Sequence, residues 1–540
     1  MYEPKRVLIV GGGSAGWMAA AYLNSALNPG SIRRAKISVV ESPDTPRIGV
    51  GEATIPSIQH LLAVIGVDLT EFMTEVDATF KQSIRYVNWL DNSGEYYHHP
   101  FTRYSSEHQT LAGELWLGSD RSIPFIETVS PQPIACEMGL SPLSLDPQVR
   151  GPRLKYAYHM NALKFADYLT RFSTARGVDH WLDHVVDVDV AENGDIAAIK
   201  TRSGKRIEAD LYIDCTGFAG ELIEKCLGVP WIDCSDWLLC DQAVTMHVPY
   251  EHYYHGAVRP YTMASALSAG WVWDIPLRSR RSLGYVHSSA FLDADTAAKE
   301  LRIFEGSHAA DLDTRIVKFK VGHRQQPWFR NCIAIGLAGS FIEPLESTGL
   351  YLSDLATVML AEHFPRGGDF EPLAFRFNRI LINRYYEILD FINMHYCLTR
   401  RTDTEFWREV RKPEHITQRL QAKFDYWRIK PPSRSDFEDQ FFPGMSATSP
   451  FAVDTGGDNR APIDTGALWD YSSYEAILYG MDFLAEECKA WYGDERYPSP
   501  VHGKVLEALD SARKILPRHE TFLKMALGMP EYPSSPDTTS

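Results

Sequence analysis

Glycines with a dinucleotide-binding spacing stand near the start of this chain, at Gly11, Gly13 and Gly16. They follow the apolar run Val7–Val10, and the residues after them have the spacing of a helix. In such a unit the first glycine permits a tight turn, the second lets the backbone approach a pyrophosphate, and the third allows close helix–strand packing. The pattern predicts a dinucleotide site; the alternative is a purely structural glycine turn.

The residues around the glycines indicate which dinucleotide binds. Ser14 and Ala15 open the expected helix, whose N-terminal N–H groups suit a diphosphate. Glu41 ends the next expected strand, where a carboxylate accepts both ribose hydroxyls and disfavours NADP. Two further strand–turn segments, Asp214–Gly217 and Gly336–Gly339, favour FAD over NAD, because flavoproteins of this architecture use such turns around the rest of the cofactor. A second glycine pattern for a nicotinamide is absent from the sequence, so we expect a separate flavin reductase to supply the reduced flavin.

Two later motifs carry side chains suited to chemistry. Trp271 and Trp273 alternate within Gly270–Pro276, which predicts both indoles on one face of a strand; two core aromatics are the alternative. The turn Glu346–Gly349 precedes an expected helix and presents backbone N–H groups to an anion. Taken alone, this turn is an ordinary helix cap with a loop carboxylate beside it.

Together these motifs resemble the flavin-dependent halogenases, in particular the branch that acts on tryptophan or related indoles. The resemblance rests on the glycine pattern, on the run Gly49–Pro56 (G-V-G-E-A-T-I-P) and on the motif W-V-W-D-I-P. It implies an α/β fold of the flavoprotein monooxygenase type, with a Rossmann-like FAD-binding part and an appended, mainly helical substrate module. The FAD contacts that it implies are Gly11, Gly13, Ser14, Ala15, Gly16, Glu41, Gly49, Val50, Gly51, Glu52, Ala53, Gly336, Leu337 and Leu350.

The resemblance also implies two catalytic side chains. Lys81 matches the lysine that holds hypohalous acid by a hydrogen bond or reacts with it as a haloamine. Taken alone, Lys81 is a solvated lysine. An ammonium group polarises a halogen electrophile, and an amine can itself be halogenated. Glu346 matches the residue that orients the electrophile or accepts the ring proton.

Halide binding and gating are implied in the same way. The halide ion, chloride or bromide, is expected at Thr348 and Gly349. Trp271, Trp273 and Ser347 are assigned to gating, which keeps the organic substrate away from the flavin so that halide is oxidised instead. Reduced FAD and O2 would thus yield hypohalous acid, which halogenates an electron-rich arene by electrophilic substitution, while the protein excludes water and presents one ring position.

The substrate side of the resemblance is weaker. His98, His99 and Phe101 are the expected partners of an indole on one face, and Trp469 on the other. The tyrosine pair and the glutamate that hold the amino-acid end of tryptophan in the family have no clear counterpart, because Phe441–Phe442 lacks the hydroxyls and residues 443–466 replace an acidic segment. Leaving the charged groups of a zwitterion poorly solvated is costly. We therefore expect free indole, or a substituted or carrier-bound indole, rather than free tryptophan.

Two other functions are compatible with parts of this pattern. A single-component flavin hydroxylase would oxidise NAD(P)H by itself and would not need Lys81. A non-catalytic flavin-binding protein would keep the glycine turns but need not keep Lys81, Glu346 and the tryptophan motif together. Since all three occur in one chain, the sequence favours the halogenase.

The bulk composition fits an intracellular enzyme. The 540 residues are 44% hydrophobic and 23% charged, as in ordinary soluble globular proteins, and the formal net charge of −16 argues against nucleic-acid binding. The eight cysteines form no C-x-x-C pair and suggest neither a zinc site nor a disulfide framework. The strand expected from Arg6 leaves no room for a signal peptide, and no apolar stretch is long enough for a bilayer. We expect a cytoplasmic protein without a membrane or metal partner; a homodimer is left open.

The elements that must position these residues follow from the periodicity. Strands and turns dominate up to Gly349, and long helices follow at about Tyr351–His363, Glu371–Leu398 and Ser472–Trp491. We predict an FAD-binding domain over residues 1–370 with interleaved sheet and substrate-facing elements. A mainly helical substrate module over 371–530 and a disordered tail over 531–540 complete the prediction.

Overall fold

The computed structural model describes residues 5–47, 49–104, 111–149, 154–367, 370–433, 436, 468–469, 471–485 and 500–535. The chain folds into two units. Unit 1 comprises residues 1–77, 160–235 and 319–385, and unit 2 comprises residues 78–159, 236–318 and 386–540. The chain thus passes repeatedly between the units. The domain boundary predicted at residue 370 does not coincide with a boundary between these two units. That residues 371–530 form a separate substrate module stays a prediction.

Unit 1 is built on a mainly parallel sheet. Its strand order is β20 (Trp328–Phe329), β21 (Cys332–Ala334), β12 (Leu211–Asp214), β1 (Lys5–Val10), β2 (Ala35–Glu41) and β8 (Asp179–Leu182). From β21 to β8 neighbouring strands are parallel, and only β20 is antiparallel. A parallel sheet buries both faces, which explains the continuous apolar run of β1. The predicted Rossmann-like α/β fold is confirmed.

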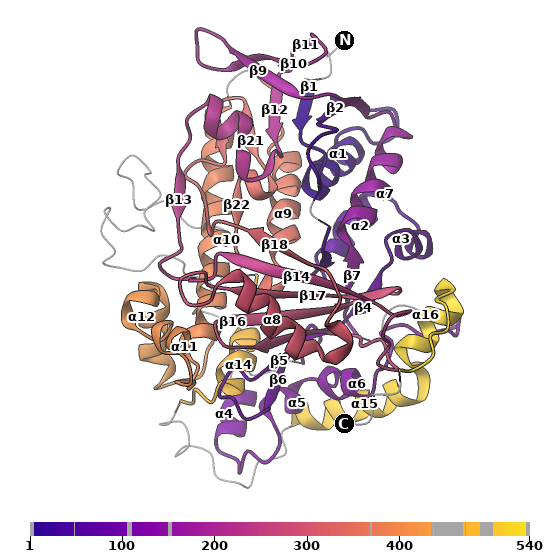
Figure 1. Ribbon diagram of the computed structural model, residues 1–540, viewed down its shortest axis with the longest axis vertical. Helices are drawn as coiled ribbons and strands as arrows, with labels where there is room; N and C mark the ends of the chain where they lie inside the picture. The colour runs from indigo at the N-terminus through magenta and orange to yellow at the C-terminus, as the bar shows by residue number, and fades with distance from the viewer. Residues whose placement is uncertain are drawn as a thin grey trace. The chain divides into compact units, whose positions relative to one another are not determined.

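Helices and a small antiparallel sheet complete unit 1. Helix α1 (Ser14–Leu27) packs against α7 (Ala162–Thr174), α9 (Gly349–Glu362) and α2 (Ile58–Ile65) (Figure 1). The sheet β9 (Val185–Val190), β10 (Ile196–Thr201) and β11 (Arg206–Ile207) shares an apolar core with β1 and β12. The remaining elements of unit 1 are β3 (Gly51–Ala53), α3 (Leu69–Glu75), β13 (Trp231–Asp233), β19 (Gly322–Arg324) and β22 (Ser340–Phe341).

Unit 2 is built on a seven-stranded sheet. Its strand order is β18 (Thr314–Lys318), β14 (Gln242–Pro249), β17 (Arg280–His287), β16 (Gly270–Pro276), β15 (Thr262–Ala266), β5 (Ser83–Val87) and β6 (Tyr96–Pro100). One face packs against α8 (Ala294–Glu305), whose Ala297 and Leu301 meet Val272, Leu283 and Tyr285 (Figure 1). A strand alternates its side chains between the two faces. Trp271 and Trp273 flank Val272 along β16 and therefore lie on the opposite face of the sheet.

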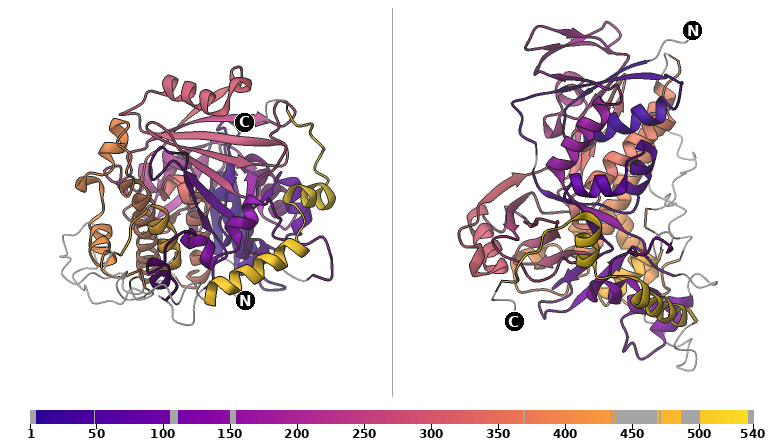
Figure 2. Two further views of the ribbon diagram at one scale, coloured as in Figure 1. Left: turned by 90° about the horizontal axis from the view of Figure 1, so that it is seen from below. Right: turned by 90° about the vertical axis from the view of Figure 1, so that its right-hand side faces the viewer.

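Short segments from both ends of unit 2 pack together. Helix α15 (Pro500–Ile515), yellow in Figure 2, lies beside α6 (Gln132–Glu137), with Leu509 and Leu516 in a cluster with Ala135. Further helices of unit 2 are α4 (Leu111–Leu117), α5 (Phe125–Val129), α11 (Glu405–Glu409), α12 (Gln418–Trp427), α14 (Tyr471–Gly480) and α16 (His519–Leu527). Helix α10 (Glu371–Cys397) has residues 371–385 in unit 1 and its remaining residues in unit 2. Strand β4 (Thr79–Lys81) pairs antiparallel with β7 (Ala157–Asn161).

The helix predicted over Ser472–Trp491 is shorter than expected. Helix α14 ends at Gly480, and Asp482 has a left-handed backbone with φ of 53°. A Cβ at position 480 would lie 2.6 Å from the Tyr97 ring, so this end of the helix is packed where only glycine fits. Residues 486–499 lie outside the described part of the chain.

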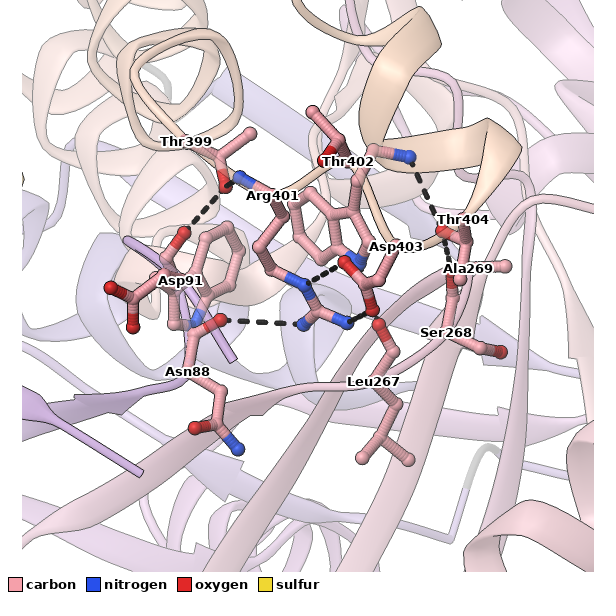
Figure 3. A network of polar contacts seen from close by, with 12 residues as sticks. Asn88, Asp91, Leu267, Ser268, Ala269, Thr399, Arg401, Thr402, Asp403 and Thr404 are labelled. Carbon is pink, nitrogen blue, oxygen red and sulfur yellow. Dashed lines mark hydrogen bonds and ion pairs between the residues drawn. The ribbon is translucent and has the colours of Figure 1, made fainter. Parts of the chain in front are cut away.

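The segment after α10 is fastened to the sheet of unit 2 by Arg401 (Figure 3). Its guanidinium donates to both carboxylate oxygens of Asp403, at 3.0 and 2.7 Å, and to the Asn88 carbonyl at 3.3 Å. It also stacks over the Trp407 ring, 4.7 Å from the centroid. The Trp407 Nε1 donates to the Leu267 carbonyl, so the segment is joined to the β15–β16 turn as well.

Half of the predicted C-terminal tail is placed by contacts. The Tyr532 ring lies 5.3 Å from Tyr250 and 5.7 Å from Tyr254, and the Ser535 amide donates to the Tyr254 carbonyl. Residues 536–540 lie outside the described residues. Within the described part of the chain, no helix has the length and apolarity to cross a membrane, and no group of three or more His, Cys, Asp or Glu is arranged for a metal ion.

Candidate active site

The glycine turn of unit 1 has the close contacts that its spacing predicted. Gly11 has a φ of 113°, and a Cβ there would lie 2.2 Å from the Cys215 carbonyl oxygen. A Cβ on Gly16 would lie 2.0 Å from the Gly11 carbonyl oxygen. Around Gly13, by contrast, a Cβ would meet nothing within 4 Å. The outer two glycines are therefore needed for packing, and the middle one faces open space at the start of α1.

Glu41 stands at the end of β2 and carries several hydrogen bonds. Its carboxylate accepts from Arg47 Nε at 2.9 Å, from Trp17 Nε1 at 3.3 Å and interacts with His180 Nε2 at 3.2 Å. Arg47 also pairs with Asp167 at 2.6 Å. The carboxylate is thus held in place at the strand end, where it is positioned for ribose hydroxyls.

The G-V-G-E-A run is joined to the glycine turn through the start of α7. The Ala162 amide donates to the Val50 carbonyl at 3.2 Å, and the Ser14 hydroxyl donates to the Ala162 carbonyl at 3.4 Å. A Cβ on Gly49 would lie 2.9 Å from Leu163, so the run lies close against α7. Desolvation raises the pKa of Glu52 to about 7. Residue 48 lies outside the described residues.

The turn before α9 has the features of an anion site. Ser347 has a left-handed backbone, with φ of 60°, and Thr348 is the N-cap of the helix. The first turn of α9 carries no acidic side chain and no side-chain cap, so its N–H groups and helix dipole are available to an anion. The Thr348 hydroxyl is buried and has no hydrogen-bond partner among the described residues. A Cβ on Gly349 would meet nothing within 4 Å.

Other predicted residues of unit 1 lie close to these turns. Gly336 has a φ of 72°, and a Cβ there would lie 2.7 Å from Ala15, so the turn before Leu337 approaches α1 closely. Glu346 is 1% exposed, and Leu350 lies in the first turn of α9. Glu346 belongs to unit 1 and Lys81 to unit 2.

These residues of unit 1 fit a bound FAD. The N-terminus of α1 has neither a side-chain cap nor an acidic residue in its first turn. Its N–H groups therefore suit a diphosphate beside Gly13. Glu41 suits the ribose, and the uncapped α9 turn suits a small anion.

Lys81 in unit 2 is fully buried, which corrects the solvated-lysine alternative. Its exposed fraction is 0%, and its Nζ lies 5.3 Å from the centroid of the Phe101 ring. Burying an ammonium is costly unless charge or hydrogen bonds compensate it. A lysine that is buried in this way is therefore a candidate catalytic residue and not a surface lysine.

Strand β4, which carries Lys81, is held on several sides. It pairs with β7, and the Thr79 hydroxyl donates to the Pro276 carbonyl of the tryptophan motif at 2.6 Å. The Phe80 amide donates to His519 Nε2 at 3.1 Å, while His519 Nδ1 donates to the Val258 carbonyl at 3.0 Å. Burial lowers the pKa of His519 to about 4, so its ring is neutral and Nε2 is free to accept.

The two tryptophans of β16 lie on the same face, as their spacing predicted. Their ring centroids are 6.3 Å apart with planes at 62°, and both side chains are buried. Trp271 also lies 6.5 Å from Trp89. Neither indole N–H has a hydrogen-bond partner among the described residues. Trp273 stands in register with Ala264 and Gly284, so both neighbouring strands leave room for its indole, whereas Trp271 stands between Ala266 and Val286.

Two of the four predicted substrate residues, His99 and Trp469, lie against the same ring, that of Phe391. Phe391 of α10 stacks on Trp469, with centroids 4.2 Å apart and planes at 13°, and its other contacts include His99 at 5.5 Å. Phe101 stands two residues after His99 and lies near Lys81. The rings of His99, Phe391 and Trp469 form one cluster that suits a flat arene.

His98 is placed elsewhere. It follows the strand alternation and points to the opposite face of β6 from His99. There its Nε2 meets Glu137 at 2.9 Å and its Nδ1 meets Ser83 at 3.0 Å. Burial lowers the pKa of His98. The structure therefore does not bring His98 to the cluster of Phe391 and Trp469.

Several residues of the site carried no signal in the sequence analysis. Glu387 accepts from the backbone amides of Leu468 and Trp469, at 2.6 and 3.4 Å, and so holds the Trp469 backbone beside Phe391. Phe391 and Glu387 are four residues apart on α10, and this helical spacing was the available signal. Phe441, Phe442 and the loop 443–466 lie outside the described residues.

Comparisons with known proteins show what this chain is similar to. The family described as tryptophan halogenase matches residues 6–494. Tryptophan 7-halogenase RebH from Lentzea aerocolonigenes is 36% identical over 94% of each chain. A tryptophan halogenase structure from Shewanella frigidimarina has a TM-score of 0.86 at 30% identity and covers 97% of this chain and 98% of its own. Tar14, a tryptophan C-6 flavin-dependent halogenase from taromycin biosynthesis, has a TM-score of 0.83 at 31% identity, with 97% and 100% covered.

Proposed function

The chain belongs to the family of flavin-dependent tryptophan halogenases, which are oxidoreductases, and on this premise we propose that it halogenates an indole-type arene with Lys81 as the catalytic lysine. The finer part of the proposal concerns the substrate: free indole, or a substituted or carrier-bound indole, in preference to free tryptophan. Chloride or bromide is the halogen source, and a separate flavin reductase supplies the reduced cofactor.

Unit 1 provides the cofactor and halide side of the reaction. The residues at the glycine turn, Glu41 and the Gly49–Ala53 run would hold FAD, which in its reduced form supplies the electrons for O2-dependent oxidation of the halide. The uncapped N–H groups of α9 and the Thr348 hydroxyl would hold the halide ion. Glu346, at the same turn, is placed to orient the electrophile or take the proton that leaves the ring.

The observation that carries the proposal is the burial of Lys81 beside Phe101. An ammonium group there donates a hydrogen bond to hypohalous acid, and the neutral amine forms a haloamine with loss of water. The cluster of His99, Phe391 and Trp469 supports a flat aromatic substrate. Excluding water from these rings would keep the electrophile from being lost to hydrolysis.

The preference for an indole without a free amino-acid end rests on the sequence of the C-terminal part. Phe441–Phe442 offers no hydroxyls to a zwitterion. A free tryptophan would then bury two charged groups without designed partners, which is costly. The printed names of RebH and Tar14 both specify tryptophan, so the preference for indole rests on this chain's own sequence and not on its relatives. The two names differ in ring position, 7 and 6, so the position does not follow from kinship.

The test supplies the protein with FAD, an unrelated flavin reductase, NADH, O2 and either bromide or chloride. Indole and free tryptophan compete in the same mixture, and products are identified by mass spectrometry. We expect monohalogenated indole in excess over halogenated tryptophan, and no halogenated product from Lys81→Ala. The control Lys514→Ala changes an exposed lysine of α15 and should keep activity.

Each of the other possible outcomes of this experiment contradicts one part of the proposed function. Halogenated tryptophan as the main product would overturn the substrate preference but keep Lys81 as catalytic. An active Lys81→Ala variant would remove Lys81 from the chemistry. Hydroxylated arene, or NADH oxidation without the added reductase, would instead favour a single-component hydroxylase.

A further inference from the structure

We propose that Gly284 of β17 is a positioning residue that sets where the Trp273 indole lies, and thereby how much oxidised halide reaches the arene. This rests on the proposed function for the activity readouts, whereas the placement of Trp273 is tested independently of it. Gly284 was not among the residues that the sequence singled out.

Gly284 stands directly opposite Trp273 in the antiparallel pair of β16 and β17. A Cβ at position 284 would lie 2.0 Å from Cζ2 of the Trp273 ring and 2.3 Å from both Cε2 and Cη2. The benzene edge of the indole therefore lies directly against the Gly284 Cα. An aromatic side chain that covers a cross-strand glycine is a known way of completing a sheet surface.

Space, and not backbone conformation, is the reason for glycine here. Gly284 is absent from the glycines with a positive φ, so its backbone is one that other residues also adopt. The three nearest atoms to its Cβ position all belong to Trp273. By contrast, Gly270 of β16 has a φ of 152° and would meet backbone atoms of Val286 and His287. Gly284 is thus a glycine that one indole ring requires.

If a side chain replaced Gly284, the Trp273 ring is the group that would have to move, because the atoms nearest to the added Cβ all belong to it. Ala264 of β15 stands opposite Trp273 on its other side, and Thr245 of β14 stands opposite Gly284. Trp273 is 8% exposed, more than Trp271 at 1%, which is packed against Trp89. A methyl group at position 284 would therefore push the Trp273 ring away from Gly284.

This displacement has a chemical consequence within unit 2. Trp273 lies on β16, whose Pro276 carbonyl accepts from Thr79 of β4, the strand that carries Lys81. A displaced Trp273 would therefore disturb how this unit holds hypohalous acid at Lys81, and more of the oxidant would be lost to water. Misplacement by about 1 Å can cost roughly 100-fold in rate, so a single methyl group is enough to matter.

The experiment compares Gly284→Ala with Gly503→Ala. Gly503 lies on α15 of the same unit, and a Cβ there would meet nothing within 4 Å. We expect Gly284→Ala to lower halogenated product per NADH consumed by roughly 10-fold to 100-fold, and to raise correspondingly the free hypohalous acid that an added scavenger traps from solution. Gly503→Ala should keep the wild-type yield.

A structural readout separates this role from simple loss of folding. The Trp271/Trp273 pair is close enough for exciton coupling, which circular dichroism detects as a paired band in the tryptophan region. Gly284→Ala should change that band while the thermal unfolding midpoint stays within a few degrees of wild type. An unchanged band and an unchanged product yield would overturn the proposal.

A double-mutant cycle shows whether Gly284 acts through Trp273. In the Trp273→Ala background the ring is gone, so Gly284→Ala should produce no further loss of coupling between NADH oxidation and halogenation. Equal losses in both backgrounds would overturn the assignment. If wild-type protein does not halogenate any arene, the proposed function fails, yet the exciton band still decides where Trp273 lies.

Discussion

At the residue scale, the buried hydroxyl of Thr348 is the sharpest test of the halide site. An unsatisfied buried hydroxyl costs about 1–3 kcal/mol. Thr348→Val keeps the shape and removes the hydroxyl, so we expect the free energy of unfolding to stay the same or increase. The KM for halide should rise roughly tenfold, because a hydrogen bond to the anion is lost. Steady-state rates at varied bromide or chloride and urea unfolding measure the two effects.

The control for this change lies on the same helix. Thr357 of α9 is also buried, but its hydroxyl donates to the Ser353 carbonyl at 2.8 Å. Thr357→Val removes a satisfied hydrogen bond and should leave the KM for halide unchanged. Equal halide KM values for Thr348→Val and wild type would show that the hydroxyl is not part of the anion site.

Single residues also mark how far a sequence can specify a site. The glycine turn was predictable because its spacing lies within one strand–turn–helix stretch, although the contact of Gly11 with the Cys215 carbonyl joins residues far apart in the chain. His98 and His99 were predicted together, although alternation along a strand separates them. Which of the two histidines faces the aromatic cluster depends on how β6 pairs with β5, where Ile84 stands opposite His99. The sequence of β6 alone does not specify this pairing.

At the element scale, β4 depends on a helix from the far end of the chain. Its Phe80 amide has His519 of α16 as acceptor. His519→Phe keeps an aromatic ring but leaves this buried N–H unsatisfied, which costs about 1–3 kcal/mol. We expect a lower free energy of unfolding and a lower kcat, because Lys81 sits on the same strand. Urea unfolding and single-turnover rates measure these effects.

The contrast for this prediction is Met525→Ala. Met525 is also on α16, but it is 70% exposed, so its truncation should alter neither quantity measurably. A His519→Phe variant with wild-type stability and wild-type kcat would show that β4 holds Lys81 without help from α16.

Elements were predicted best where their signals lie within one stretch of chain. Helix α1 begins at Ser14 and β2 ends at Glu41, as expected. Helix α14 was predicted too long because its end is set by packing of Gly480 on Tyr97. Such a contact joins residues far apart in the chain and leaves no periodic trace in the sequence.

At the scale of the whole molecule, the interleaving of the two units was the part that periodicity could not show. The predicted change from sheet to helix near Gly349 describes the order of elements along the chain. The division into units follows which strands pair. Strand β5 pairs with β15, and β12 pairs with β1, so stretches of chain alternate between sheets. Pairings between strands that lie so far apart in the chain depend on the complete set of strands.

The titratable groups predict that the two units respond oppositely to acid. In unit 2, burial lowers the pKa values of several described histidines: His98, His159, His255, His287, His502 and His519. For His255 and His519 the value falls to about 4. Their stabilising effect is complete above the unfolded value of about 6.5 and is lost as pH falls toward 4. Glu127, whose pKa is raised by burial, opposes this trend.

In unit 1 the shifted pKa values predict the opposite change of stability with pH. Burial raises the pKa values of Glu52 and Asp354 to about 7, whereas it lowers that of His323 to about 4. A buried acid with a raised pKa contributes full stability below its unfolded value of about 4, and this is lost as pH rises through about 7. Each group contributes up to about 1.4 kcal/mol per pH unit within its window. With two acids against one histidine, unit 1 should gain stability when the pH falls from about 7 to about 5.

Hydrogen–deuterium exchange resolved by peptide measures this difference directly, since each peptide belongs to one unit. After correction for the intrinsic exchange rate, protection should fall in the β14–β17 peptides of unit 2 and rise in the β1–β2 and α9 peptides of unit 1 between about pH 7 and about pH 5. Asp354→Asn supplies the check, because a neutral side chain cannot gain from protonation and should reduce the rise in α9. Parallel changes in both units would contradict the assignment of neutral forms to these buried groups.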